Sequence, residues 1–157
     1  MNKLEELSGE LGRKHKNINE LILVIQKAVW SHADSLPEKY EPKNIIESRF
    51  TPAEEAYEKG IVSCGAMANI SAETLRYLGY KVKLIHGECK ESVDHAWISV
   101  FDPTSETWKE FDLTRKNAEV PSTHIKKGEV ESWETLRKQI QEDHKTMIDR
   151  RKQRGLI

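Results

Sequence analysis

Residues 63–79 read SCGAMANISAETLRYLG, and this stretch decides the fold because it predicts one complete helix with a reactive side chain at its start. Ser63 is a preferred N-cap residue, and Gly79 stands where a left-handed C-terminal cap is expected. Between them, small and apolar residues recur at helical spacing: Cys64, Met67, Ala68, Ser71, Leu75 and Leu78. We therefore expect Cys64 in the first turn, on the side of the helix that faces the core.

The apolar period changes to two after Gly79, which is typical of β-strands. Residues 82–87, 94–101 and 107–113 are expected to form strands, and Asp102–Glu106 has the composition of a tight turn between the last two. These segments predict an antiparallel meander that follows the central helix.

Helical patterns flank this centre on both sides. Residues 18–33 have a helical period, and Thr51-Pro52-Ala53 is typical of a helix start with Thr51 as N-cap and Gly60 as the end. A C-terminal amphipathic helix is expected from the spacing of Trp133, Leu136, Ile140 and Met147. The order of elements predicts an α+β fold in a single domain over 1–157, with a core at about 50–115 and flanking helical segments at 1–50 and 116–157.

Composition narrows the possible partners and compartments. The 25 basic and 26 acidic residues give a net charge of -1, which provides no general footprint for nucleic acid. The apolar run Leu21–Ile25 is too short to span a membrane, and the first residues carry acidic charge without the apolar segment of a signal peptide. The two cysteines are expected to be free thiols, and a cytoplasmic location is the default expectation.

Cys64 has a physical reason to be reactive. The N–H groups at a helix N-terminus lower the pKa of a thiol, and the thiolate is the nucleophilic form of cysteine. The same N–H groups can hold the oxyanion that develops when a nucleophile attacks a carbonyl. The position therefore suits acyl-transfer chemistry.

His95 and Asp112 are the expected partners of this thiol. A turn centred on Thr104-Ser105 pairs Asp102 with Thr107, and the same register places Asp112 opposite Trp97. His95 and Asp112 are then diagonal neighbours on one face, about 7–8 Å apart. His95 would accept the thiol proton and later protonate the leaving amine, while Asp112 would orient the imidazole. A shift of one residue in the register would move Asp112 to the other face.

This constellation resembles the transglutaminase-like superfamily, whose papain-like core packs a cysteine-bearing helix on a small antiparallel sheet. The likeness covers roughly residues 50–115 and rests on the Gly60–Cys64 segment, on Leu78-Gly79-Tyr80, on His95-Ala96-Trp97 and on Asp112-Leu113-Thr114. The resemblance implies a catalytic order of Cys64, His95 and Asp112. Leu113 departs from the family pattern, which commonly has proline there.

The source of a second oxyanion donor stays open. Papain-type enzymes use a glutamine shortly before the cysteine, and the glutamine upstream here, Gln26, is too distant to equate. Trp97 and local backbone amides are the candidates, although packing in the sheet is the more ordinary role for Trp97.

The other polar residues give weaker indications of a catalytic or metal site. His86 and Cys89 are three apart on a continuing strand and so face opposite sides, which argues against a shared metal ion. His124 has no partner in the sequence that indicates chemistry. No metal and no cofactor are expected.

These features predict a thiol-dependent enzyme that acts on a peptide or glutamine-type amide, with hydrolysis (a cysteine peptidase or amidase) favoured over cross-linking acyl transfer. One alternative is a catalytically silent domain that binds a peptide or protein. Another is a redox or metal protein that uses both cysteines.

Overall fold

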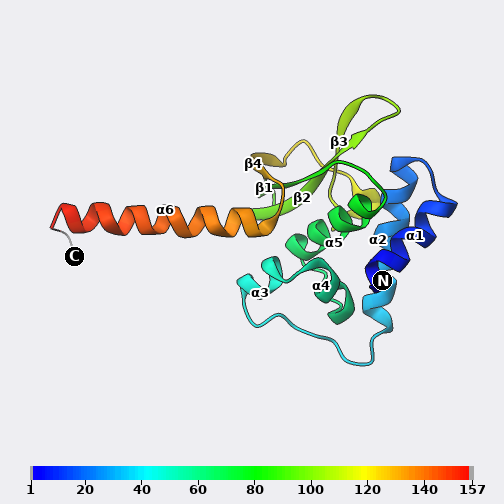
Figure 1. Ribbon diagram of the computed structural model, residues 1–157, viewed down its shortest axis with the longest axis horizontal. Coiled ribbons are helices and arrows are strands. Elements are labelled where there is room, and N and C mark those ends of the chain that lie inside the picture. The colour runs from blue at the N-terminus through cyan, green and yellow to red at the C-terminus, as the bar shows by residue number, and fades with distance from the viewer. Residues whose placement is uncertain (1, 156–157) are drawn as a thin grey trace.

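The computed structural model describes residues 2–155 and has an α+β architecture (Figure 1). The elements, in chain order, are α1 (Lys3–Lys14), α2 (Ile18–Ser35), α3 (Ile45–Phe50), α4 (Ala53–Lys59), α5 (Cys64–Tyr77), β1 (Val82–Cys89), β2 (Ser92–Asp102), β3 (Thr107–Phe111), the 3-10 turn η1 (Lys116–Ala118), β4 (Ile125–Val130) and α6 (Trp133–Gln153).

The strands form one antiparallel sheet in the order β3-β2-β1-β4. The predicted hairpin register is confirmed, because Asp102 pairs with Thr107 and Ile98 pairs with Phe111. The carboxylate of Asp102 accepts a hydrogen bond from the Thr104 N–H at 3.0 Å, which is how an aspartate fixes a tight turn. The three expected strands are thus present, and β4 adds an unpredicted fourth.

Helix α5 packs along β2 and β1 and forms the centre of the core. Its buried residues include Met67, Ile70 and Leu75, which belong to the same apolar cluster as Leu84 and Ile98 of the sheet. Helices α1, α2 and α4 lie against one another and against α5. The helix that carries Cys64 is therefore held in the middle of the molecule.

The ends of the helices follow the sequence in most places. Ser63 caps α5 by accepting a hydrogen bond from the Ala66 N–H, and Gly60 and Gly79 both have the positive φ that their capping positions require. The predicted cap at Thr51 is wrong, because α4 begins after Pro52 without a side-chain cap. The Thr51 hydroxyl instead donates to the backbone carbonyl of Glu47 in α3.

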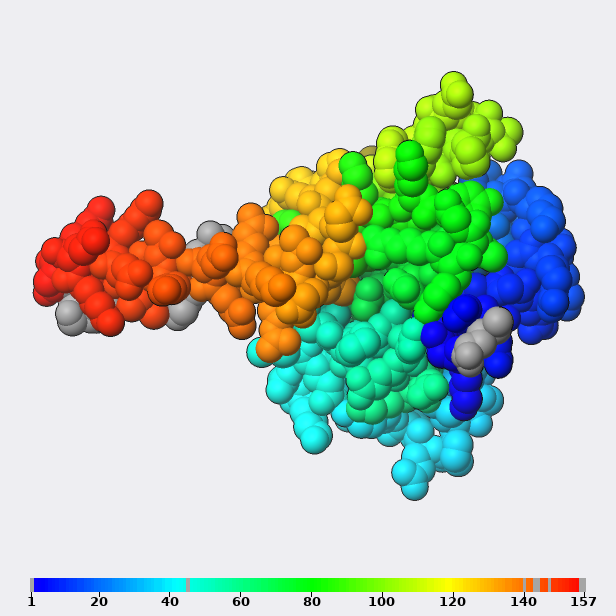
Figure 2. Space-filling view, viewed as in Figure 1, coloured from blue at the N-terminus to red at the C-terminus, as the bar shows by residue number. Residues whose placement is uncertain are grey.

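Helix α6 packs on the body only at its start. Trp133 and Leu136 are buried there, and the remainder of the helix extends away from the body (Figures 1 and 2). The side chains of Ile140 and Met147, which the sequence places on its apolar stripe, lie outside what the structure describes. Across residues 2–155, none of the helices combines the length and the apolar character needed to cross a membrane.

Candidate active site

The first turn of α5 is fixed by contacts from three directions. Ser63 donates its hydroxyl to the Ser48 carbonyl at 3.0 Å while its oxygen caps the helix. The indole of Trp133 donates to the Gly65 carbonyl at 2.9 Å. Gly65 allows a close approach of α3, because a Cβ atom there would make a tight contact of 3.2 Å with the Cα of Arg49. The thiol of Cys64 is thereby held in a defined place.

Cys64 meets His95 at this turn. Burial alone would raise the pKa of the Cys64 thiol, but the side-chain hydrogen bond with His95, the charge of that imidazole and the backbone N–H of Ala96 outweigh burial and leave the pKa below its ordinary value. The positive charge of Arg49 acts in the same direction. The structure thus brings together two of the predicted residues and gives the thiol a reason to ionise.

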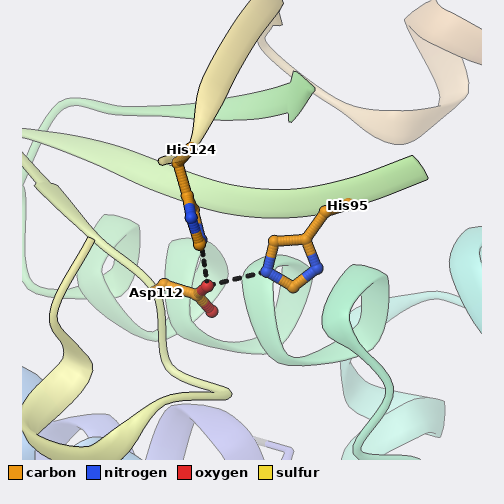
Figure 3. Close-up of side chains that lie close together, drawn as sticks. All are labelled: His95, Asp112 and His124. Atoms are coloured by element: carbon orange, nitrogen blue, oxygen red, sulfur yellow. Dashed lines mark hydrogen bonds and ion pairs between the residues drawn. The ribbon is translucent and has the colours of Figure 1, made fainter. Parts of the chain in front are cut away.

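Asp112 completes the expected set. The Nε2 atom of His95 lies 2.7 Å from Asp112 Oδ2, and the carboxylate is fully buried (Figure 3). Because Nε2 is bonded to the carboxylate, Nδ1 is the ring nitrogen left for the thiol. Asp112 stands one residue beyond β3, so the hairpin register that orients the strand also delivers the carboxylate.

The loop after β3 is built to hold this carboxylate. Asp112 Oδ1 accepts hydrogen bonds from both the N–H and the hydroxyl of Thr114, at 3.1 and 2.6 Å. From α2, the buried Gln26 amide donates to the carbonyls of Leu113 and Arg115, at 2.8 and 2.7 Å. Gln26 therefore supports the loop that carries Asp112, although it precedes Leu113 by 87 residues in the chain. This role differs from that of the papain glutamine, with which Gln26 is not equated.

His124 is the residue that sequence reasoning missed. The expectation that it has no chemical partner is wrong, because its Nε2 lies 2.9 Å from Asp112 Oδ2, the same oxygen that bonds His95 (Figure 3). Its side chain is 1% exposed and lies edge-on to the rings of both Trp97 and His95. No motif or spacing in the neighbouring sequence indicates this contact, because it depends on the position at which β4 begins.

The charges of the set are mutually consistent. The hydrogen bonds to Asp112 and to Cys64 raise the pKa of His95 to about 10, although burial opposes this. Burial would raise the pKa of Asp112, but hydrogen bonds from His95, Thr114 and His124 lower it to about 2. Near neutral pH the arrangement therefore favours an imidazolium at His95 beside a carboxylate at Asp112, and the positive charge of the ring favours ionisation of the Cys64 thiol.

Trp97 occupies a different position from the one expected of an oxyanion donor. It is buried in the sheet, and its indole N–H donates to Glu110 at 2.6 Å. Within the first turn of α5, the N–H groups of Cys64 and Gly65 are among those that a helix leaves without an intrahelical partner. Backbone amides are thus the better candidates for this role.

His95, Asp112 and His124 also constitute a potential metal-binding set, because one ligand atom from each lies within 4.8 Å of the others. Two imidazoles and a carboxylate suit zinc and related divalent ions. The separations of 2.7 and 2.9 Å are those of hydrogen bonds. A ligating histidine ordinarily has a partner at its other ring nitrogen, whereas Nδ1 of His124 has none among the described residues.

Two surface hollows adjoin the residues that precede Cys64 and His95. One, of about 570 Å³, includes Ser63, Val62 and Tyr40. The other, of about 620 Å³, includes Asp94 and Arg49, which form an ion pair at 2.6 Å. Both hollows are open to solvent, and they are lined by these neighbouring residues and not by Cys64 or His95.

Comparisons of this chain with protein-family models, with curated proteins and with solved structures find no match.

Proposed function

We propose that the protein is a thiol-dependent acyl-transfer enzyme with a papain-like or transglutaminase-like core, in which Cys64 is the nucleophile, His95 the acid and base, and Asp112 the residue that orients His95. The observation that carries the proposal is the hydrogen bond between His95 and the buried Asp112 carboxylate, together with the lowering of the Cys64 pKa by the same imidazole. A cysteine that only fills space in the core would not need a histidine next to it that is hydrogen-bonded to a buried carboxylate.

The reaction begins when the Cys64 thiolate attacks the carbonyl carbon of an amide. Backbone N–H groups at the start of α5 hold the oxyanion, the C–N bond breaks, and His95 gives its proton to the leaving amine. Water then attacks the thioester, His95 accepts the proton of that water, and a carboxylic acid leaves as the thiolate is restored. If an amine replaces water, the product is a new amide.

We favour hydrolysis of a peptide or protein segment, for which the open hollows beside Ser63 and Asp94 offer surface next to the site. The alternative is a silent domain that binds such a segment without cleaving it. The two differ in whether a covalent bond changes.

Incubation of the protein with a mixed peptide library in ¹⁸O-labelled water separates these outcomes. New peptide C-termini that carry ¹⁸O indicate a peptidase, and glutamate with ¹⁸O at former glutamine positions indicates an amidase. Addition of a primary amine reveals transamidation by the mass of the adduct. We expect labelled products from the wild type and from Cys89→Ala, and none from Cys64→Ala. Absence of product with every peptide, water and amine would contradict the proposal.

A further inference from the structure

We propose that His124 is a positioning residue of this site, which holds the Asp112 carboxylate in the orientation that His95 requires. The inference rests on the proposed function and adds a residue to it that the Cys64–His95–Asp112 set does not include.

The hydrogen bonds around Asp112 leave the carboxylate little freedom. Thr114 occupies Oδ1 with two donors, and Oδ2 receives Nε2 of both His95 and His124. Arg115 is close to Oδ2 as well, with its Nε at 3.5 Å. If His124 were removed, Arg115 would be the remaining group at Oδ2, apart from His95 itself, that opposes rotation of the carboxylate. Arg115 is farther from Oδ2 than His124 is.

The position of His124 is itself firmly determined. The residue directly precedes β4, which pairs with β1, and its ring lies 4.9 Å from that of Trp97 and 5.2 Å from that of His95. The close approach of β4 needs a glycine in β1, since a Cβ atom at Gly87 would lie 2.2 Å from the Ile125 carbonyl oxygen. A buried ring fixed in this way can impose a position on its partner.

The tautomer of His124 decides between this role and that of a metal ligand. To hydrogen-bond the carboxylate, the His124 ring needs a proton on Nε2 and none on Nδ1. A metal at Nε2 would instead require the proton on Nδ1, a buried donor for which the described residues offer no acceptor. The unpartnered Nδ1 therefore favours the hydrogen bond.

A matched pair of variants tests the proposal. His124→Gln keeps an N–H donor near the position of Nε2, whereas His124→Leu keeps the apolar volume and removes the donor; His124→Met serves as a second donor-free variant if the leucine protein does not fold. One readout is the rate of Cys64 alkylation by iodoacetamide, with Cys89 as the internal reference. The other is the titration of the His95 ring, followed by NMR of ¹⁵N-labelled histidine, which does not depend on any activity of the thiol.

We expect the leucine variant to slow Cys64 alkylation about 10-fold and to lower the midpoint of the His95 titration, because the carboxylate no longer stays in place. The glutamine variant should restore both quantities most of the way. A leucine variant that matches the wild type in both readouts would overturn the proposal, as would equal losses in the two variants. Stoichiometric binding of Zn²⁺ to the wild type that His124→Leu abolishes would assign His124 as a ligand instead and would also overturn it.

The two proposals fail in distinguishable ways. A wild-type Cys64 that reacts no faster than Cys89 contradicts the proposed function, whatever the variants do. In that event the His95 titration still compares the glutamine and leucine variants and decides the role of His124.

Discussion

The two cysteines of the chain differ in their surroundings and not in their degree of exposure, since both are half-buried free thiols. Cys64 begins a capped helix and contacts an imidazole that is backed by a buried carboxylate. Cys89 ends β1 opposite Ser92, beside the ion pair of Glu91 with Arg115 and without an imidazole partner among the described residues. The neighbouring groups, and not accessibility alone, therefore distinguish a nucleophilic cysteine from a bystander thiol.

The largest expected effect comes from removing the charge behind His95. Asp112→Asn keeps the shape of the side chain but removes its negative charge, so the imidazolium loses its main support. We expect turnover in the peptide assay to fall by about 10²–10⁴-fold, and Cys64 to approach Cys89 in its rate of alkylation.

The matched control is Asp102→Asn, which alters a carboxylate on the same hairpin that pairs with Lys109. Its turnover should remain near that of the wild type. Loss of turnover in both variants, with an intact fold in both, would show that the hairpin as a whole and not the Asp112 charge supports the thiol.

The Asp112 carboxylate should also make the free energy of unfolding depend on pH in the acid range. The pKa of Asp112 is about 2 in the folded protein against an ordinary 3.8, so the unfolded chain binds the proton more readily between these values. The associated stability is present above about pH 4 and is lost as the pH falls through 2, and it amounts to about 2 kcal/mol.

Urea unfolding at a series of pH values between 5 and 2 measures this contribution. In Asp112→Asn the corresponding part of the pH dependence should disappear. An identical slope in the wild type and the variant would mean that the carboxylate is not held in the way described.

A smaller effect is expected from Arg49, which lies near Cys64 and lowers its pKa by charge alone. Arg49→Gln removes that charge and also the ion pair with Asp94. Since the arginine is already paired and the imidazole supplies the main effect, we expect alkylation of Cys64 to slow only a few-fold, as is typical of charges screened near a surface.

Lys14→Gln provides the control for a change of net charge, because Lys14 is an exposed residue of α1 paired with Glu10. The rate for Cys64 should not change in that variant. A loss of more than about 10-fold in Arg49→Gln would indicate that Arg49, and not His95, is the main support of the thiolate.

The sequence predicts those parts of the site that depend on local signals. The start of α5 follows from Ser63, and the hairpin register follows from the turn at Asp102–Glu106. Both predictions depend on interactions between residues close in the chain. The strand predicted to reach residue 113 ends at Phe111, so Asp112 meets His95 from one residue beyond β3 and not from a paired position in the sheet.

The missed parts depend on contacts between distant segments. The β4 sequence IKKGEV lacks a clear apolar alternation, and its pairing with β1 compensates for this only in the folded molecule. The contact of His124 with Asp112 follows from this pairing, and the support that Gln26 gives to the Asp112 loop follows from the packing of α2 against that loop. Neither contact produces a periodic pattern or a capping motif in the sequence from which it could be predicted.

The central claim is that the surroundings of Cys64 make it a nucleophile, and the most direct test is the rate of alkylation of each cysteine in the wild-type protein. Samples treated with iodoacetamide at pH 7 are quenched at intervals, and the two cysteine-containing peptides are quantified by mass spectrometry. We expect Cys64 to react at least about 10-fold faster than Cys89, because an ordinary thiol is only a few per cent ionised at this pH. Equal and slow reaction of the two thiols would contradict the claim.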